Sequence, residues 1–156
     1  MKNLTHSKIS RYDEIVFVCS GNIIRSAFAE LLAKNLLPTI KFSSCGTVYF
    51  NNQILHETKV ALISREISSE IINNFKPTHI TNAKKYNLNS CIFFGMTNKH
   101  LKEIRNHFGN DANVRLLRDL IDEHEEVEDP YFTNNFDLVF DKISECIFQL
   151  EKYLIK

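Results

Sequence analysis

Residues 15–37 read IVFVCSGNIIRSAFAELLAKNLL. Four apolar residues lead into Cys19, Arg25 follows after five intervening residues, and Ser26 comes next. The residues after Ser26 repeat apolar side chains at helical spacing up to Pro38. The stretch therefore predicts a strand, a short loop and an amphipathic helix, with a cysteine at the point where the strand ends.

This loop has the composition of an oxyanion cradle. Backbone N–H groups of a short loop that leads into a helix N-terminus can point at a bound anion. Gly21 permits a close backbone approach, and the Asn22 side chain can bond across the loop. Arg25 can hold two phosphate oxygens with its planar guanidinium. Because the helix N-terminus, Arg25 and a hydrogen bond from Ser26 all favour a thiolate, the pattern predicts phosphoryl transfer through Cys19.

Further strand-like runs alternate with helical patterns along the rest of the chain. The expected strands cover residues 13–18, 40–44, 90–96 and 114–117. The expected helices cover residues 28–36, 56–64, 97–108 and 136–154. This alternation predicts an α/β fold, a single-domain three-layer sandwich with a central four-stranded parallel sheet flanked by helices. The phosphate-binding loop would follow the first strand, where ligands sit in such folds.

Composition limits the possible roles of the chain. A length of 156 residues is typical of one domain. The 19 basic and 19 acidic residues balance, which argues against a general nucleic-acid or membrane-surface role. No apolar run reaches the roughly 18 residues of a membrane span, and the N-terminus does not resemble a signal peptide. We therefore expect a cytoplasmic protein with a flexible N-terminal arm at residues 1–11 and one domain at residues 12–156.

The four cysteines lie at positions 19, 45, 91 and 146 and form no Cys-x-x-Cys pair. This spacing indicates neither a zinc site nor a disulfide framework. Cys45, Cys91 and Cys146 lie in apolar stretches and are expected as small core residues. We expect no metal and no cofactor.

Residues 18–26 resemble the signature of the low-molecular-weight protein tyrosine phosphatases. A second segment, Asp129-Pro130-Tyr131-Phe132, resembles the Asp-Pro-aromatic segment of that family, and it lies roughly a hundred residues after Cys19. The resemblance extends over nearly the whole chain from Tyr12 onward.

The resemblance implies a role for each of three residues. Cys19 would attack phosphorus and form a cysteinyl-phosphate, and Arg25 would stabilise the transition state. Asp129 would protonate the leaving phenolate and then activate water. The acidic segment at residues 122–129 would favour the protonated acid, and Pro130 would stiffen the loop that presents it.

The resemblance also implies a set of substrate-binding residues. Aromatic side chains are expected to flank a phenyl phosphate, with either Tyr49 or Phe50 in the variable loop. The predicted set around a phosphate or other oxyanion is Ser20, Gly21, Asn22, Ile23, Ile24, Ser26, Phe50 and Tyr131.

The chain departs from the family pattern in three places. Ile24 replaces a cysteine that can form a protective disulfide with the nucleophile, so oxidation of Cys19 could pass the reversible stage. Ala27 replaces a proline that is common at the helix start. Residues 68–76 lack the His and Arg-Gln run of many members, which leaves open how Asn22 is supported.

The expected function is hydrolysis of phosphotyrosine in proteins, and three alternatives remain. Arsenate reductases on this scaffold need two further redox cysteines that lie a few residues apart. Cys91 has no such partner, since no cysteine follows it until Cys146. Arginine phosphatases prefer a small hydroxyl residue where Ile23 stands, whereas Ile23 suits an aromatic ring. A non-catalytic phosphate-binding relative would need neither the thiol nor the acid. The expected partner is a tyrosine-phosphorylated protein, and bacterial relatives suggest a tyrosine kinase.

Overall fold

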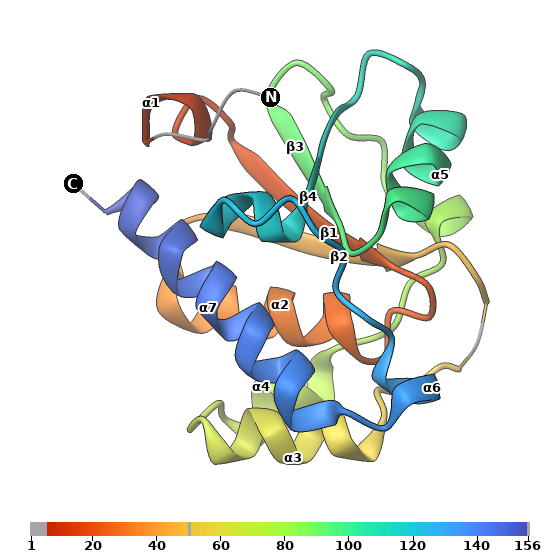
Figure 1. The fold of residues 1–156 in the computed structure, drawn as a ribbon, viewed down its shortest axis with the longest axis vertical. Coiled ribbons are helices and arrows are strands. Elements are labelled where there is room, and N and C mark those ends of the chain that lie inside the picture. The colour runs from red at the N-terminus through yellow and green to blue at the C-terminus, as the bar shows by residue number, and fades with distance from the viewer. Residues whose placement is uncertain (1–5, 50, 156) are drawn as a thin grey trace.

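The computed structural model describes residues 6–49 and 51–155. At its centre is a parallel sheet with the strand order β2-β1-β3-β4 (Figure 1). The four strands are β1 (Glu14–Cys19), β2 (Lys41–Gly46), β3 (Cys91–Gly95) and β4 (Asn113–Leu116). The sheet that the sequence predicted is confirmed, with strand bounds shifted by at most two residues.

Helices cover both faces of the sheet (Figure 1). The larger core contains α2 (Arg25–Leu36), η2 (Leu117–Ile121) and α7 (Phe136–Leu154), with α3 (His56–Ser64) and α4 (Ser69–Asn74) beside them. The smaller core contains α5 (Asn98–Phe108) and η1 (Ile80–Asn82). The alternation along β1 explains the two layers, because Ile15 and Phe17 face the larger core while Val16 and Val18 face the smaller one.

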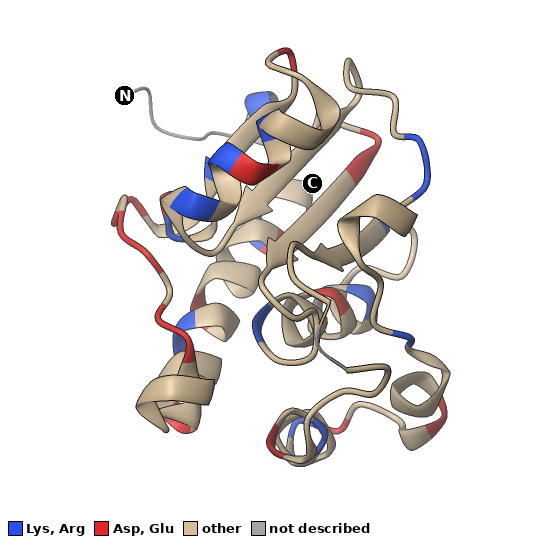
Figure 2. Cartoon of the chain, turned by 90° about the vertical axis from the view of Figure 1, so that its right-hand side faces the viewer, with Lys and Arg blue, Asp and Glu red and all other residues tan. Residues whose placement is uncertain are grey.

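The register of the sheet places the functional end of the molecule. Cys19 pairs with Gly46 on one side, and Val18 pairs with Gly95 on the other. The strands therefore end at one edge of the sheet, and the loops that follow β1, β2 and β3 meet there. This edge faces the viewer in Figure 2.

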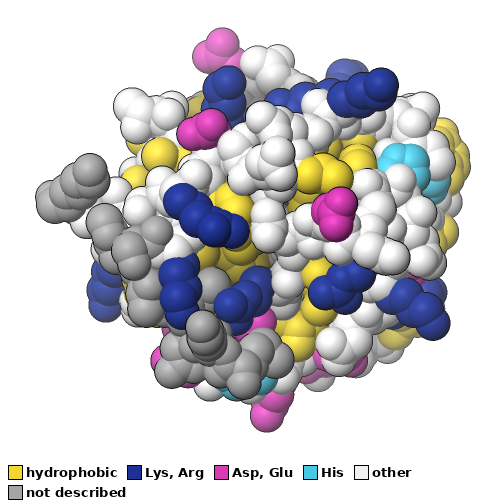
Figure 3. All heavy atoms as spheres, turned by 90° about the horizontal axis from the view of Figure 1, so that it is seen from above, with side chains coloured by type: hydrophobic (Ala, Val, Ile, Leu, Met, Phe, Trp, Pro, Cys, Tyr) yellow, Lys and Arg dark blue, Asp and Glu magenta, His cyan; other side chains and the backbone are white. Residues whose placement is uncertain are grey.

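The N-terminal segment differs from the expected arm. His6–Ile9 form the short helix α1, and Ile9 is fully buried in the larger core. An isoleucine side chain gains about 1.5–3 kcal/mol from such burial, which is a physical reason for this segment to be packed. Residues 1–5 of the expected arm lie outside the described residues. Within the described part of the chain, no helix is long and apolar enough to cross a membrane. On the face at the top of Figure 1, basic side chains lie scattered among hydrophobic and uncharged ones (Figure 3).

Candidate active site

The loop between β1 and α2 is fixed by its neighbours in the sheet. Thr47 N–H donates to Cys19 O at 3.0 Å, and Val48 N–H donates to Ser20 O at 2.8 Å. A Cβ atom at Gly46 would lie 2.5 Å from Ser20 O, so only glycine allows this close approach. Ile24 at the N-cap of α2 offers no side-chain hydrogen bond to the first N–H groups of the helix. These groups suit an anion.

Asn22 has a left-handed backbone with φ 55° and bonds across the loop. Its Nδ2 donates to Ser26 Oγ at 2.7 Å and to Ser44 Oγ at 2.8 Å. Its Oδ1 accepts from Thr78 N–H at 2.9 Å, and Ser44 Oγ donates to Glu30 Oε1 at 2.7 Å. This network supports Asn22, although residues 68–76 lack the His and Arg-Gln run of many family members.

The sulfur of Cys19 lies among hydrogen-bond donors. Asn22 N–H donates to Sγ at 3.3 Å, and Ser26 Oγ lies 2.9 Å from the same atom. Because Ser26 Oγ already accepts from the Asn22 amide, its own proton is available to the sulfur. The site therefore provides two donors of the kind that a thiolate accepts.

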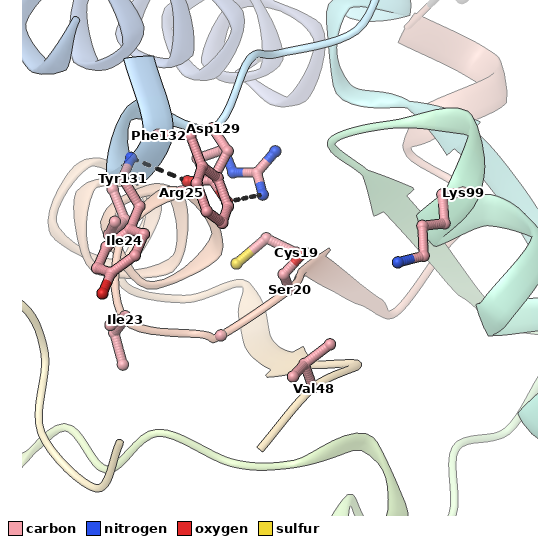
Figure 4. Close-up of a pocket in the computed structure, with 11 residues that line it drawn as sticks. Cys19, Ser20, Ile23, Ile24, Arg25, Val48, Lys99, Asp129, Tyr131 and Phe132 are labelled. Atoms are coloured by element: carbon pink, nitrogen blue, oxygen red, sulfur yellow. Dashed lines mark hydrogen bonds and ion pairs between the residues drawn. The ribbon is translucent and has the colours of Figure 1, made fainter. Parts of the chain in front are cut away.

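Arg25 joins the loop to the predicted acid, which lies far away in the sequence. Its side chain is 3% exposed, and its Nη1 donates to Val127 O at 2.9 Å. Its Nη2 lies 3.3 Å from Asp129 Oδ2 in an ion pair (Figure 4). Val127 N–H donates to Met96 O at 2.8 Å and so ties this segment to the end of β3. Asp129 then caps α6 (Pro130–Thr133) by accepting from Tyr131 N–H at 3.0 Å.

A cavity of about 240 Å³ brings most of the predicted site together (Figure 4). The predicted residues that line it are Cys19, Ser20, Gly21, Ile23, Ile24, Arg25, Asp129 and Tyr131. Asn22 and Ser26 are buried and act from behind the loop. Phe50 lies outside the described residues, and Val48 lines the cavity from the same variable loop. The sequence missed Val48, Lys99 and Phe132, which also line it.

The apolar side of the cavity consists of loop and rim residues. Ile23 and Ile24 are almost fully buried, whereas Tyr131 is 48% exposed and Phe132 is 82% exposed. The rings of Tyr131 and Phe132 meet edge to face with centroids 5.2 Å apart. Together these side chains offer an apolar surface beside the cysteine.

His100 is a further residue that the sequence reasoning missed. Its Nε2 lies 2.9 Å from Ser20 Oγ, and its Nδ1 accepts from Thr97 N–H at 3.1 Å. Burial and the positive charges of Arg25 and Lys99 lower the pKa of His100 to about 3. The imidazole is therefore neutral at physiological pH. The sequence signal for His100 is its position three residues after Thr97, where a side chain can bond back to the N-cap of a helix.

The other three cysteines have a different environment from Cys19. Burial raises the pKa of Cys45, Cys91 and Cys146 to about 12 in each case. All four cysteines are free thiols. Among the described residues, no group of three or more His, Cys, Asp or Glu side chains could hold a metal ion.

Comparisons with known proteins agree with this geometry. The model of the low molecular weight phosphotyrosine protein phosphatase family matches residues 14–156. The low molecular weight protein-tyrosine-phosphatase PtpB of Staphylococcus epidermidis is 33% identical over 128 residues, which cover 80% of this chain and 85% of that protein.

Two solved structures share the fold. The tyrosine phosphatase amsI of Erwinia amylovora matches with a TM-score of 0.77 and 20% identity, over 93% of this chain and 95% of that one. The YwlE arginine phosphatase of Geobacillus stearothermophilus matches with a TM-score of 0.73 and 21% identity, over 89% of this chain and 90% of that one. From the family match and the sequence relative, the chain belongs to the low molecular weight phosphotyrosine protein phosphatase family.

Proposed function

We propose that this protein hydrolyses phosphotyrosine in proteins through a cysteinyl-phosphate on Cys19. The observation that supports it is one cavity in which the Cys19 sulfur, the Arg25 guanidinium and the Asp129 carboxylate converge. A nucleophile, an anion clamp and a general acid are the groups that this reaction needs.

In the first step, the phosphoryl group enters the loop and competes with Asp129 for the guanidinium of Arg25. The thiolate of Cys19 attacks phosphorus, the bond from phosphorus to the phenol oxygen breaks, and that oxygen takes the electron pair. Asp129, which takes up a proton from solvent as the incoming dianion displaces it from Arg25, gives that proton to the leaving oxygen.

In the second step, the carboxylate of Asp129 takes a proton from water while the water oxygen attacks phosphorus. The bond between sulfur and phosphorus breaks, and the electron pair returns to Cys19. The Ser26 hydroxyl and the Asn22 N–H are placed to stabilise the thiolate that leaves. Inorganic phosphate is the product.

The shape of the cavity supports an aromatic phosphoester as the substrate. Ile23 and Tyr131 offer apolar surface beside the sulfur, and a phenyl ring buries more such surface than an alkyl phosphate can. The physiological substrate would be a tyrosine-phosphorylated protein, with a bacterial tyrosine kinase as a specific candidate. A cytoplasmic location suits a catalytic thiol that must stay reduced.

The test is hydrolysis of p-nitrophenyl phosphate without added metal by the intact protein, Cys19→Ser and Asp129→Asn. We expect no turnover by Cys19→Ser and a loss of about 10²–10⁴ in kcat for Asp129→Asn. A Cys146→Ser variant is the matched control and should retain activity.

A second comparison uses a phosphotyrosine peptide and a phosphoarginine peptide. Preference for phosphotyrosine supports the proposal, and preference for phosphoarginine would assign the arginine phosphatase activity instead. No turnover of either peptide by the reduced, intact protein would overturn the enzyme proposal.

A further inference from the structure

The two sides of the cavity differ in chemistry (Figure 4). Ile23, Ile24 and Tyr131 form the apolar side. Lys99 reaches in from α5 on the opposite side, with its ammonium group toward the loop that carries Cys19 and Ser20. The phosphoryl group of a phenyl phosphate binds in the loop, and its ring contacts the apolar side. The mechanism therefore uses neither Lys99 nor the Ser20 hydroxyl.

The hydrogen bonds around His100 determine the direction of the Ser20 contact. Thr97 N–H can only donate, so Nδ1 of the neutral His100 ring is an acceptor. The ring proton is then on Nε2, which donates to Ser20 Oγ at 2.9 Å. The Ser20 hydroxyl proton is therefore not used by His100 and can be donated into the cavity that Ser20 lines.

Lys99 is weakly held by the charges around it. Its side chain is 74% exposed, and its Nζ lies 3.8 Å from Glu103 Oε1, at the outer limit of an ion pair. The first turn of a helix does not favour a positive charge, and Asn98 N–H in that turn already donates to Glu126 Oε2 at 2.7 Å. An ammonium group that is exposed and only weakly paired is available to an anion.

We propose that Ser20 and Lys99 form a second anion subsite, which binds the carboxylate of an Asp or Glu residue next to the phosphotyrosine. A hydroxyl donor and an ammonium group are suitable partners for a carboxylate. His100 is the positioning residue, because it holds the Ser20 oxygen and leaves its proton free. This inference rests on the proposed function and names the class of substrate, an acidic phosphotyrosine segment.

The surrounding charge adds a direction to this preference. Basic residues predominate on α5, which also carries Glu103, and acidic residues follow one another along the segment that leads to α6 (Figure 2). Glu125 of that segment pairs with Arg118 at 2.9 Å, whereas Glu128 accepts from Asn135. An acidic neighbour of the phosphotyrosine therefore meets attraction on the α5 side and repulsion on the other.

The test compares two phosphotyrosine peptides that differ only in Glu or Gln at the positions flanking the phosphotyrosine. For the intact protein at low salt we expect kcat/KM to be about threefold higher for the Glu peptide, through a lower KM. Added salt should reduce the ratio. Lys99→Ala should abolish the preference. Lys102→Ala removes the same charge from an exposed position on α5 outside the cavity and should keep the preference.

A second pair of variants tests the positioning residue. The amide of His100→Gln can reach as far as the Nε2 position of histidine, whereas the amide of His100→Asn reaches only the Nδ1 position. We expect the peptide preference to fall in His100→Asn and to be largely kept in His100→Gln. An equal loss in both variants would contradict the positioning role.

Equal kcat/KM for the two peptides in the intact protein would overturn the subsite, as would a preference that survives Lys99→Ala. The failure of the proposed function is a separate outcome, in which the intact protein turns over neither peptide. In that case the two peptides are compared by calorimetric binding to the same intact protein. Tighter binding of the Glu peptide would then support the subsite, and equal binding would overturn it.

Discussion

The loop at residues 19–26 and the segment at residues 127–132 form the two halves of one cavity and are held very differently. Asn22 and Ser26 are buried in a network that extends to Ser44 and Thr78. In the other half, Val127 is 2% exposed, whereas Tyr131 and Phe132 at its end are 48% and 82% exposed. The loop that carries the proposed nucleophile is thus held in place before substrate arrives, while the exposed rim can adapt. Changes in the loop should lower kcat, and changes in the exposed aromatic rim, Tyr131 and Phe132, should raise KM.

Among the further substitutions that compare the two halves, Arg25→Lys should have the largest effect. A lysine cannot form the planar clamp on phosphate and loses the donors to Val127 and Asp129 that Arg25 now provides. We expect kcat/KM for p-nitrophenyl phosphate to fall by about 10²–10³. Arg65→Lys is the matched control, since Arg65 pairs with Asp141 at the surface. Nearly full activity in Arg25→Lys would contradict the role of the clamp.

The next largest effect should come from Asn22. Two substitutions separate the loss of its hydrogen bonds from the strain of its backbone conformation. Asn22→Ala removes three side-chain hydrogen bonds and puts an alanine at φ 55°. We expect the free energy of unfolding to fall by about 2–4 kcal/mol. Asn22→Gly loses the same bonds without the backbone strain, so it should be less destabilised by about 1 kcal/mol. Denaturant unfolding measures both free energies. An unchanged stability in Asn22→Ala would contradict the claim that the buried network around Asn22 holds the loop.

His100 should make stability depend on pH. The pKa of His100 is lowered to about 3 in the folded protein, so between about pH 6.5 and pH 3 the unfolded chain binds a proton that the folded one does not. This contribution is complete above pH 6.5 and is lost as the pH falls, with a slope of up to about 1.4 kcal/mol per pH unit. Unfolding measured from pH 7 to pH 4 should show a smaller slope in His100→Gln. Identical slopes would show that the imidazole is not held neutral.

The smallest effect should come from the rim. Tyr131→Ala removes part of an apolar wall that is half exposed, so it should raise KM for a phosphotyrosine peptide about fivefold and leave kcat within about twofold. Tyr153→Ala, on α7 outside the cavity, controls for the loss of an aromatic side chain. A fall in kcat comparable to that of Arg25→Lys would contradict the claim that the loop determines kcat and the rim determines KM.

The sequence predicted the loop well because strand, cradle and helix are contiguous there. Periodicity placed β1 and α2, and the residue types between Cys19 and Arg25 define an anion site without help from distant segments. Asp129 could be identified only through the family resemblance, because no local pattern connects it to Arg25. The supports of the loop, Ser44 and Thr78, come from other strands and turns and depend on the tertiary fold.

Other features could not be predicted for the same physical reason. In the sequence, His100 looks like an ordinary helix residue. In the fold, its Nε2 lies 2.9 Å from Ser20 Oγ. Ile9 reads as part of a polar terminus until α7 covers it. In both cases the burial comes from contacts between segments that are far apart along the chain.

The mechanism is tested most directly by detecting the phosphorylated intermediate. The intact protein is mixed with p-nitrophenyl phosphate, quenched rapidly in acid, digested and analysed by mass spectrometry. We predict a phosphoryl group on the peptide that contains Cys19, absent from Cys19→Ser and present at a higher level in Asp129→Asn if hydrolysis of the intermediate is slowed. Turnover with no phosphoryl group on Cys19, or with the group on another residue, would contradict the mechanism.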